Sequence, residues 1–365
     1  MKNLARPSIL NVKNYVPGKP IEEVERELGL KNVIKLASNE NCFGPSPMAV
    51  SAIRKALRKI NRYPDSNNFY LKERLGPLLG VKGENLIFGN GSDEIICLAI
   101  RAFVGERDEV VIAKPTFLVY EIASQAQGAV IKNVGLTKDF RYDLKEMKKA
   151  VSARTKLVFI ANPDNPTGTY ITRKELDEFL HGLPENLIVF LDEAYFEFAV
   201  HSFKDYPDGI DYLKDPRIIV ARSFSKVYGL AGLRIGYGIS SPNVINCMER
   251  VREPFNINIL AQAGALAALD DGAFLKKTIS HVETEREFLY SAFRKMGLEY
   301  VRSATNFIIV NTGRDCKVIF NALLKEGVIV RDMKAWGLDT FIRVTVGTHK
   351  ENRRFVEALK KVISE

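Results

Sequence analysis

Short apolar runs alternate with longer amphipathic stretches along the chain up to about residue 240. The runs are four to six residues long, as buried strands are, and the stretches between them repeat apolar residues with helical spacing. The runs lie at residues 33–37, 86–89, 109–113, 129–134, 156–161, 187–191, 217–221 and 234–239. This alternation predicts an α/β fold with a mainly parallel sheet flanked by helices. Thr172 and Glu175 form a capping-box pattern that predicts a helix through Leu180, as a crossover between two strands.

The pattern changes after Pro254. A long helical stretch is expected over 258–295, and shorter strand-like and helical runs follow to the end of the chain. This order indicates a smaller α+β domain with a sheet of its own. We therefore expect an N-terminal arm at 1–30 that packs with the small domain, a large domain at 31–255 and the small domain at 256–365.

Composition narrows the function classes. The chain has 365 residues, 46% of them hydrophobic, and a net charge of +9 in which basic and acidic residues are interspersed. Such mixing is typical of solvated helix faces, so we expect no nucleic-acid partner. The four cysteines lack metal-type spacing, residues 1–10 lack a long apolar region, and no apolar run approaches the roughly 20 residues of a membrane span. We expect a cytoplasmic protein without a metal or a membrane partner.

Lys226 follows one expected strand and precedes another, so it lies on a loop between core strands. An amine held there with little water tends to lose its charge and becomes nucleophilic toward a carbonyl, as a Schiff base requires. Ser223, Ser225 and Arg234 add hydroxyls and a guanidinium fork suited to a phosphate. A solvated lysine on a glycine-rich turn is the ordinary alternative, so other parts of the chain must decide.

The segment 89–94 ends a strand and opens a helix at Gly91 and Ser92. Free backbone N–H groups and the positive helix end converge there and favour an anion, although a plain helix cap would look similar. A dinucleotide-binding fingerprint fails because Glu94 occupies the third glycine position, which argues against a nicotinamide oxidoreductase.

Polar residues follow several successive strands. Asn165 comes after the strand at 156–161, Asp192 and Tyr195 after the next, and Ser223 and Lys226 after a third. Open parallel sheets bind ligands beyond the carboxyl ends of their strands. The pattern therefore predicts one site at that edge, next to the helix start at Gly91.

Taken together, a series of motifs resembles the fold-type I aminotransferases that depend on pyridoxal phosphate, most closely the histidinol-phosphate aminotransferases. The motifs lie at residues 36–41, 62–65, 91–94, 115–117, 162–168, 192–195, 223–236, 304–307, 330–332 and 341–348. The resemblance covers nearly the whole chain. It implies a large cofactor-binding domain, a small C-terminal domain and a homodimer with shared active sites.

The resemblance also implies a role for each site residue. Lys226 would hold the cofactor covalently and later move a proton, while Asp192 would keep the ring nitrogen protonated so that the ring accepts electrons. Asn165 and Tyr195 would hydrogen-bond the ring hydroxyl oxygen, and Phe117 would stack on the ring. The residues matching positions around the cofactor phosphate are Ser92, Asp93, Ser223, Ser225, Arg234 and, from the neighbouring subunit, Tyr63.

Two arginines match substrate positions. Arg343 would clamp a carboxylate, and Arg331 would bind a phosphate, with Tyr15 and Asn165 beside them. The implied reaction exchanges an amino group between L-histidinol phosphate and 2-oxoglutarate in histidine biosynthesis, giving imidazole acetol phosphate and glutamate. Cys42 stands where the family usually has proline.

Three rivals stay open at this point. An aromatic amino-acid aminotransferase and a threonine-phosphate decarboxylase would share the fold and keep Lys226, Asp192 and Arg234. A transcription regulator built on the same fold would need an added DNA-binding module.

Overall fold

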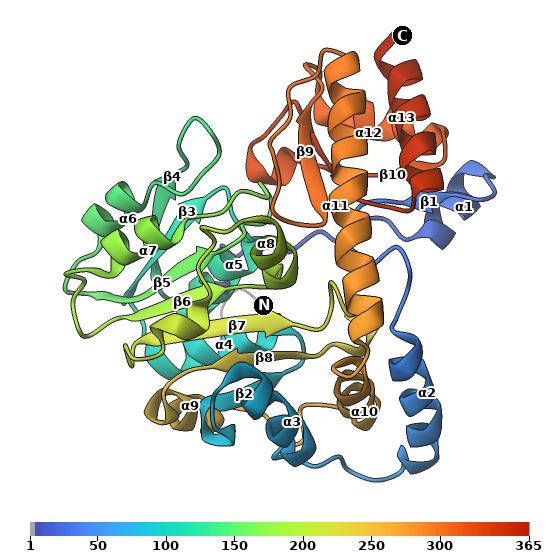
Figure 1. Ribbon diagram of the computed structural model, residues 1–365. Coiled ribbons are helices and arrows are strands. Elements are labelled where there is room, and N and C mark those ends of the chain that lie inside the picture. Colours follow the sequence, from blue (N-terminus) through green and yellow to red (C-terminus); the bar gives the residue numbers. More distant parts are fainter. Residues whose placement is uncertain (1–3, 365) are drawn as a thin grey trace.

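The computed structural model describes residues 4–364, and its centre is a seven-stranded sheet (Figure 1). In spatial order the strands are β2 (Leu86–Gly89), β8 (Gly236–Ile239), β7 (Ile218–Ser223), β6 (Ile188–Asp192), β5 (Thr155–Ala161), β3 (Glu109–Lys114) and β4 (Val130–Gly135). β8 runs antiparallel to both of its neighbours, β2 and β7, and all the other paired strands of this sheet are parallel. The predicted α/β class and mainly parallel sheet are confirmed. Residues 1–3 of the expected arm and residue 365 of the expected small domain lie outside the described range.

The central strands are buried along their whole length, as strands of a parallel sheet covered on both faces are. The helices that follow the strands are α4 (Ser92–Phe103), α5 (Leu118–Gln127), α6 (Leu144–Ala150), α7 (Arg173–Leu180), α8 (Phe196–Ser202) and α9 (Pro242–Glu249). Because parallel strands are joined by such crossovers, the carboxyl ends of β5, β6 and β7 meet at one edge.

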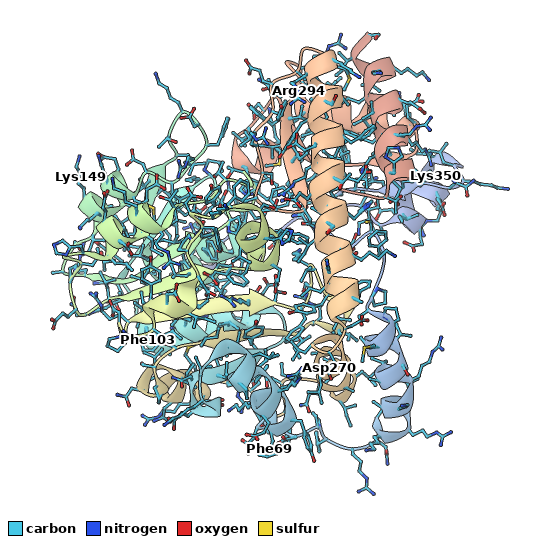
Figure 2. The ribbon with its side chains drawn as sticks, in the orientation of Figure 1. Phe69, Phe103, Lys149, Asp270, Arg294 and Lys350 are labelled. Atoms are coloured by element: carbon cyan, nitrogen blue, oxygen red, sulfur yellow. The ribbon has the colours of Figure 1, made fainter. Side chains whose placement is uncertain are left out.

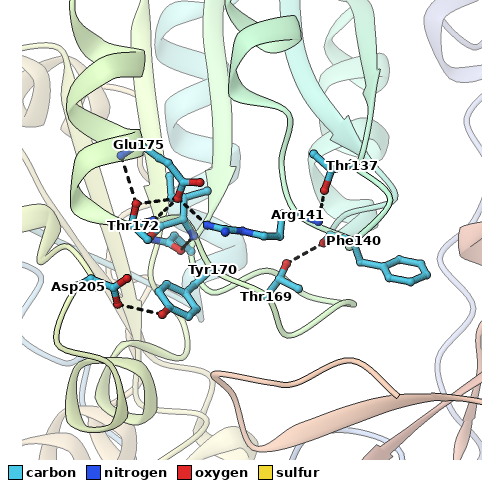
Figure 3. A network of polar contacts seen from close by, with 10 residues as sticks. Thr137, Phe140, Arg141, Thr169, Tyr170, Thr172, Glu175 and Asp205 are labelled. Carbon is cyan, nitrogen blue, oxygen red and sulfur yellow. Dashed lines mark hydrogen bonds and ion pairs between the residues drawn. The ribbon is translucent and has the colours of Figure 1, made fainter. Parts of the chain in front are cut away.

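The capping box at the start of α7 forms as predicted (Figure 3). The Glu175 carboxylate accepts from the Thr172 backbone N–H at 2.7 Å, and it also pairs with Arg141. Close by, Thr169 Oγ1 donates to the Phe140 carbonyl at 2.8 Å, and the Phe140 ring meets Phe341 edge-on with centroids 5.3 Å apart. This contact joins the loop after β4 to the C-terminal part of the chain.

The C-terminal part contains a three-stranded antiparallel sheet, in the order β11 (Arg331–Asp332), β12 (Phe341–Thr345) and β9 (Phe307–Asn311). A separate two-stranded parallel sheet pairs β1 (Ile34–Lys35) with β10 (Val328–Ile329). The expectation that residues 33–37 join the main sheet is therefore wrong. Their apolar side chains belong to other cores, because Val33 packs with Ile329 and Leu36 packs with the buried residues around β9.

The predicted helix over 258–295 is two helices, α10 (Ile259–Ala268) and α11 (Gly272–Lys295). Asp271 ends the continuity because its carboxylate accepts from the Phe274 N–H at 3.2 Å and so caps α11. The same carboxylate accepts from Ser46 Oγ at 2.6 Å, which fixes the junction against another segment. Figure 2 shows the neighbouring Asp270 at this junction, below the long column of α11.

Two large hydrophobic cores organise these elements, one around the seven-stranded sheet and one around the three-stranded sheet. The remaining helices are α1 (Ile21–Leu28), α2 (Pro47–Ala56), α3 (Phe69–Leu79), α12 (Cys316–Lys325) and α13 (His349–Ser364). The first core includes Ala261 and Ala265 of α10. The division of the chain near residue 255, and that of the arm at 30, stay predictions. Within residues 4–364, none of the helices has both the length and the apolar character that a membrane crossing requires.

Candidate active site

A cavity of about 270 Å³ lies at the carboxyl ends of β5, β6 and β7. It receives side chains from both the seven-stranded and the three-stranded sheet. The predicted site residues that line it are Tyr15, Ser92, Asp93, Phe117, Asn165, Asp192, Tyr195, Ser223, Ser225, Lys226, Arg234, Arg331 and Arg343. The fold therefore brings together residues that are more than 300 positions apart in sequence.

Lys226 is held between the two large cores. Phe224 is fully buried in the core of the large sheet, and Val227, next to the lysine, is fully buried in the other. The Lys226 carbonyl accepts from the Gly229 N–H at 3.1 Å, which closes the turn. The amine nitrogen Nζ lies 5.4 Å from the centroid of the Tyr195 ring. This backbone leaves the amine directed into the cavity while its neighbours anchor it.

Asp192 ends β6 and is almost completely buried. One carboxylate oxygen accepts from Tyr120 Oη at 2.6 Å, and the other accepts from the Ala194 N–H at 3.1 Å. Burial raises the pKa of this carboxyl to about 6, although the Tyr120 bond acts in the opposite direction. We did not predict Tyr120, which lies in the first turn of α5, three residues after Phe117.

Asn39 is a second residue that the sequence did not single out. Its Nδ2 donates to Tyr195 Oη at 2.9 Å, and its backbone N–H donates to Thr345 Oγ1 at 2.9 Å. The residue is buried and has a left-handed φ of 56°. Asn39 therefore fixes the hydroxyl of Tyr195 from the side of the three-stranded sheet. Its place in the motif at 36–41 was the available signal.

The start of α4 is an open helix end close to Arg234. Gly91 is the N-cap residue, and no side chain caps the helix there. Gly91 has a φ of 83°, which favours glycine, and a Cβ there would lie 2.4 Å from Arg234 Nη2 and would displace the guanidinium. Arg234 Nη2 lies 3.2 Å from Asp93 Oδ2. The arginine does not open the strand as we expected: its φ is 55°, and β8 begins at Gly236.

Arg331 and Arg343 lie directly opposite each other on the paired strands β11 and β12, and both are buried. Arg331 Nη2 donates to the Val16 carbonyl at 2.6 Å. Arg343 donates to the Asn165 side-chain oxygen and, at 3.1 Å, to the Ala37 carbonyl, while its Nε has no hydrogen-bond partner within the described chain. Neither guanidinium forms an ion pair with a carboxylate among residues 4–364. Two buried cations without a counter-ion make this end of the cavity a receptor for anions.

Comparison with known proteins decides the family. The sequence matches the family described as aminotransferase class I and II over residues 31–359. The chain belongs to this aminotransferase family. A histidinol-phosphate aminotransferase of Moorella thermoacetica is 49% identical over 98% of this chain and 93% of its own length. A second, from Carboxydothermus hydrogenoformans, is 47% identical over 99% of both chains.

Solved structures agree with this assignment. A crystal structure of histidinol-phosphate aminotransferase from Sinorhizobium meliloti, in complex with pyridoxal-5'-phosphate, superposes on this aminotransferase with a TM-score of 0.90. The two are 32% identical, and the match covers 99% of this chain and 98% of the other.

Behind the cavity, a buried ion pair ties together two strand ends of the aminotransferase. Arg222, which precedes Ser223, donates from Nε and Nη2 to one oxygen of Glu193 at 2.9 and 2.7 Å. Glu193 follows Asp192. Since both partners are buried, the pair fixes the ends of β6 and β7 relative to each other. This pair could not be predicted from the sequence, because two charges 29 positions apart carry no local sign of contact.

Tyr63 is the one predicted residue that the aminotransferase chain does not bring to its own cavity. Its side chain is 83% exposed and stacks on Phe255, with ring centroids 4.7 Å apart. Within a single chain it therefore contributes nothing to the site.

Proposed function

We propose that this aminotransferase uses pyridoxal phosphate to exchange an amino group between L-histidinol phosphate and 2-oxoglutarate. The products are imidazole acetol phosphate and glutamate, in a step of histidine biosynthesis. The observation that carries the proposal is the pair of buried arginines without counter-ions in the same cavity as Lys226. Histidinol phosphate offers a phosphate and glutamate offers two carboxylates, so one pocket must accept both kinds of anion, as guanidinium forks do. The names of the similar proteins support the same substrate.

The cavity fits the cofactor in its charges. Asp192 is a buried carboxylate that forms no ion pair among the described residues, and a protonated ring nitrogen would be its counter-ion. The start of α4 fits a phosphate because no side chain caps its first N–H groups and the positive end of the helix dipole attracts anions. Ser223, Ser225 and Arg234 line the same end. We assign these groups to the cofactor phosphate, and Asn165 and Tyr195 to the ring hydroxyl.

Each protein group then has one task. When bound, pyridoxal phosphate supplies an aldehyde that links to amines and a ring that accepts electrons from the substrate carbon. Asp192 would keep the proton on the ring nitrogen, and Phe117 would stack on the ring. Lys226 Nζ would hold the cofactor between turnovers and would accept and return the proton of the substrate carbon. Arg331 and Arg343 orient the substrate through its anions.

The test is kcat/KM for L-histidinol phosphate and for phenylalanine, each with 2-oxoglutarate as acceptor. Wild type should prefer histidinol phosphate. Arg331→Ala should lower its kcat/KM by roughly 30-fold or more and affect phenylalanine less, since losing one partner of a desolvated charge pair costs about 2–5 kcal/mol. Lys334→Ala is the matched control, because it removes a neighbouring but exposed cation that pairs with Asp315 and Asp339.

Other outcomes identify the rivals. A wild type that prefers phenylalanine would indicate an aromatic amino-acid aminotransferase. Release of carbon dioxide from threonine phosphate, without transfer of the amino group, would indicate the decarboxylase.

We also propose that the active enzyme is a cytoplasmic homodimer in which Tyr63 of one chain reaches the cofactor phosphate of the other. Support comes from the exposed apolar side chains on α2, α3 and the segment between them; Figure 2 shows one, Phe69, at the lower edge of the molecule. They are Met48, Leu57, Ile60, Tyr63, Phe69 and Tyr70. Apolar surface of this extent is typical of a protein interface. All four cysteines are free, as a reducing compartment favours.

A further inference from the structure

The two arginines of the cavity raise a question of stability that their hydrogen bonds do not answer. Each arginine is more than nine-tenths buried, and the two lie opposite each other in the register of the paired strands. Burial lowers the pKa of Arg343, and the charge of Arg331 lowers it further. A buried cation usually needs a carboxylate partner, yet none pairs with either residue between positions 4 and 364. An interaction other than an ion pair must therefore help to stabilise the two buried guanidinium charges.

One aromatic side chain lies against both arginines. The guanidinium carbon Cζ of Arg331 lies 5.2 Å from the centroid of the Trp336 ring, and that of Arg343 lies 5.7 Å from it. Arg343 has a second aromatic neighbour, Phe307, at 5.1 Å. Arg331 has only Trp336 among the cation–π contacts of the described chain. An indole face is the strongest aromatic partner for a cation, and its attraction acts within about 6 Å.

An aromatic face differs from a carboxylate because it leaves the charge and the N–H donors of the guanidinium available to a substrate. A carboxylate would neutralise the guanidinium and occupy its N–H fork, which is the group that recognises a substrate anion. The indole stabilises the positive charge through its ring and takes none of the N–H donors. Arg343 Nε indeed remains without a hydrogen-bond partner in the described chain. The arginines can thus stay buried and still attract an anion.

Trp336 is itself fixed from its other edge. Its Nε1 donates to the Thr116 carbonyl at 2.9 Å, across the gap between the C-terminal part and the loop after β3. Thr116 is buried and bonds in turn to Asp164 at 2.8 Å, and it directly precedes Phe117 of the cavity. The indole is therefore held by the part of the chain that we assign to the cofactor.

We propose that Trp336 is a positioning residue for substrate anions, because one immobilised indole orients both guanidinium forks and keeps their charges available. The inference rests on the proposed function in taking Arg331 and Arg343 as the substrate's anion receptors. It goes further by assigning the orientation of these two arginines to Trp336, which is not itself one of the anion receptors.

The test measures binding of succinate, an unreactive dicarboxylate, to the cofactor-loaded enzyme by titration calorimetry. Trp336→Leu removes the ring, whereas Trp336→Phe keeps a smaller aromatic face and loses the N–H donor to Thr116. We expect Trp336→Leu to raise Kd by at least about tenfold and Trp336→Phe by less than about threefold, since only the former loses its cation–π partner. Phe341→Leu is the matched control: it deletes a half-buried ring from the same sheet that packs on Phe140. It should leave Kd unchanged.

Kinetics separate positioning from general damage. In Trp336→Leu, KM for L-histidinol phosphate should rise by at least about tenfold, while kcat changes by less than about threefold, because only anion binding is disturbed. Equal succinate Kd values for the Leu and Phe variants, or a Leu variant that binds like wild type, would overturn the inference. If Trp336→Leu does not fold, Trp336→Met takes its place, because it keeps a large apolar side chain without a ring; the same rise in Kd is expected, and an unchanged Kd would overturn the inference. Wild type that binds succinate but does not turn over histidinol phosphate would contradict the proposed function and leave this inference standing.

Discussion

Asp192 shows how a single buried charge links stability to chemistry. In the chain without cofactor its carboxylate has a hydroxyl and a backbone N–H as partners, and no cation of residues 4–364 lies within ion-pair distance. Burial raises its pKa from the ordinary 3.8 to about 6. The folded protein therefore binds a proton at this site more tightly than the unfolded chain does. Stability from this site is present below the unfolded pKa and is lost as pH rises through the folded one.

The raised pKa of Asp192 predicts that replacing this carboxylate by an amide stabilises the protein without cofactor. Without cofactor, Asp192→Asn should unfold less readily than wild type above pH 6, by about 3 kcal/mol, and the two should converge below about pH 4. The loaded enzyme should show the opposite order, since the variant lacks the counter-ion for the ring nitrogen. Urea unfolding of both forms between pH 4 and 8 is the measurement. Curves for wild type and variant that run parallel across this range would show that the carboxyl is not perturbed.

At the scale of residues, sequence reasoning found the groups that follow strands. Asp192 and Asn165 could be placed because a strand end is readable from an apolar run. Tyr120 could not, because its hydroxyl reaches Asp192 from a neighbouring helix, and only packing decides that contact. Trp336 was missed for the same reason: no local pattern shows that a ring will lie against two arginines.

At the scale of elements, the start of α4 depends on two glycines. Gly91 has a φ of 83°, and Gly236 brings β8 so near that a Cβ there would lie 2.6 Å from the Ser92 nitrogen. Both let the strand, the helix end and Arg234 converge on one anion site. The helix start was predictable from the sequence, but the tight approach was not, since it depends on β8 running antiparallel between β2 and β7.

Gly91→Ala should therefore weaken cofactor binding. The methyl group would meet Arg234 Nη2 at 2.4 Å and would strain a left-handed backbone, at a cost of about 1–3 kcal/mol. We expect the Kd for pyridoxal phosphate to rise by roughly 10-fold or more, since about 1.4 kcal/mol corresponds to tenfold. Gly232→Ala, in the same loop as Arg234 but with open space around its Cα, is the control and should bind normally. Equal affinities in both variants would remove α4 from the phosphate site.

Two elements differ from their predicted form because the spacing of apolar residues did not decide between alternatives. Residues 33–37 have the composition of a strand of the main sheet, yet they pair with β10, because a short apolar run does not reveal its partner. The split between α10 and α11 was missed although Asp270, Asp271 and Gly272 are poor helix formers, because the alanine-rich run before them and the long amphipathic run after them outweighed that short signal.

At the scale of the whole molecule, the exposed position of Tyr63 leads to a complementation experiment. Lys226→Ala and Tyr63→Ala should each be inactive alone, the first without its amine and the second without a phosphate contact across the interface. Mixed and allowed to exchange, they should form heterodimers with one intact site and recover roughly a quarter of wild-type activity, the fraction that random pairing in a two-fold dimer gives. No recovery after verified exchange would place the function of Tyr63 within its own chain.

The large sheet is complete by residue 239, whereas both arginines that we assign to the substrate lie beyond residue 330. During translation the N-terminal portion of a chain emerges and folds first. A growing chain therefore acquires the groups assigned to the cofactor before those assigned to the substrate. A transcript cut short ahead of β9 would encode a protein with Lys226 and the residues assigned to the cofactor phosphate, but without either arginine assigned to the substrate.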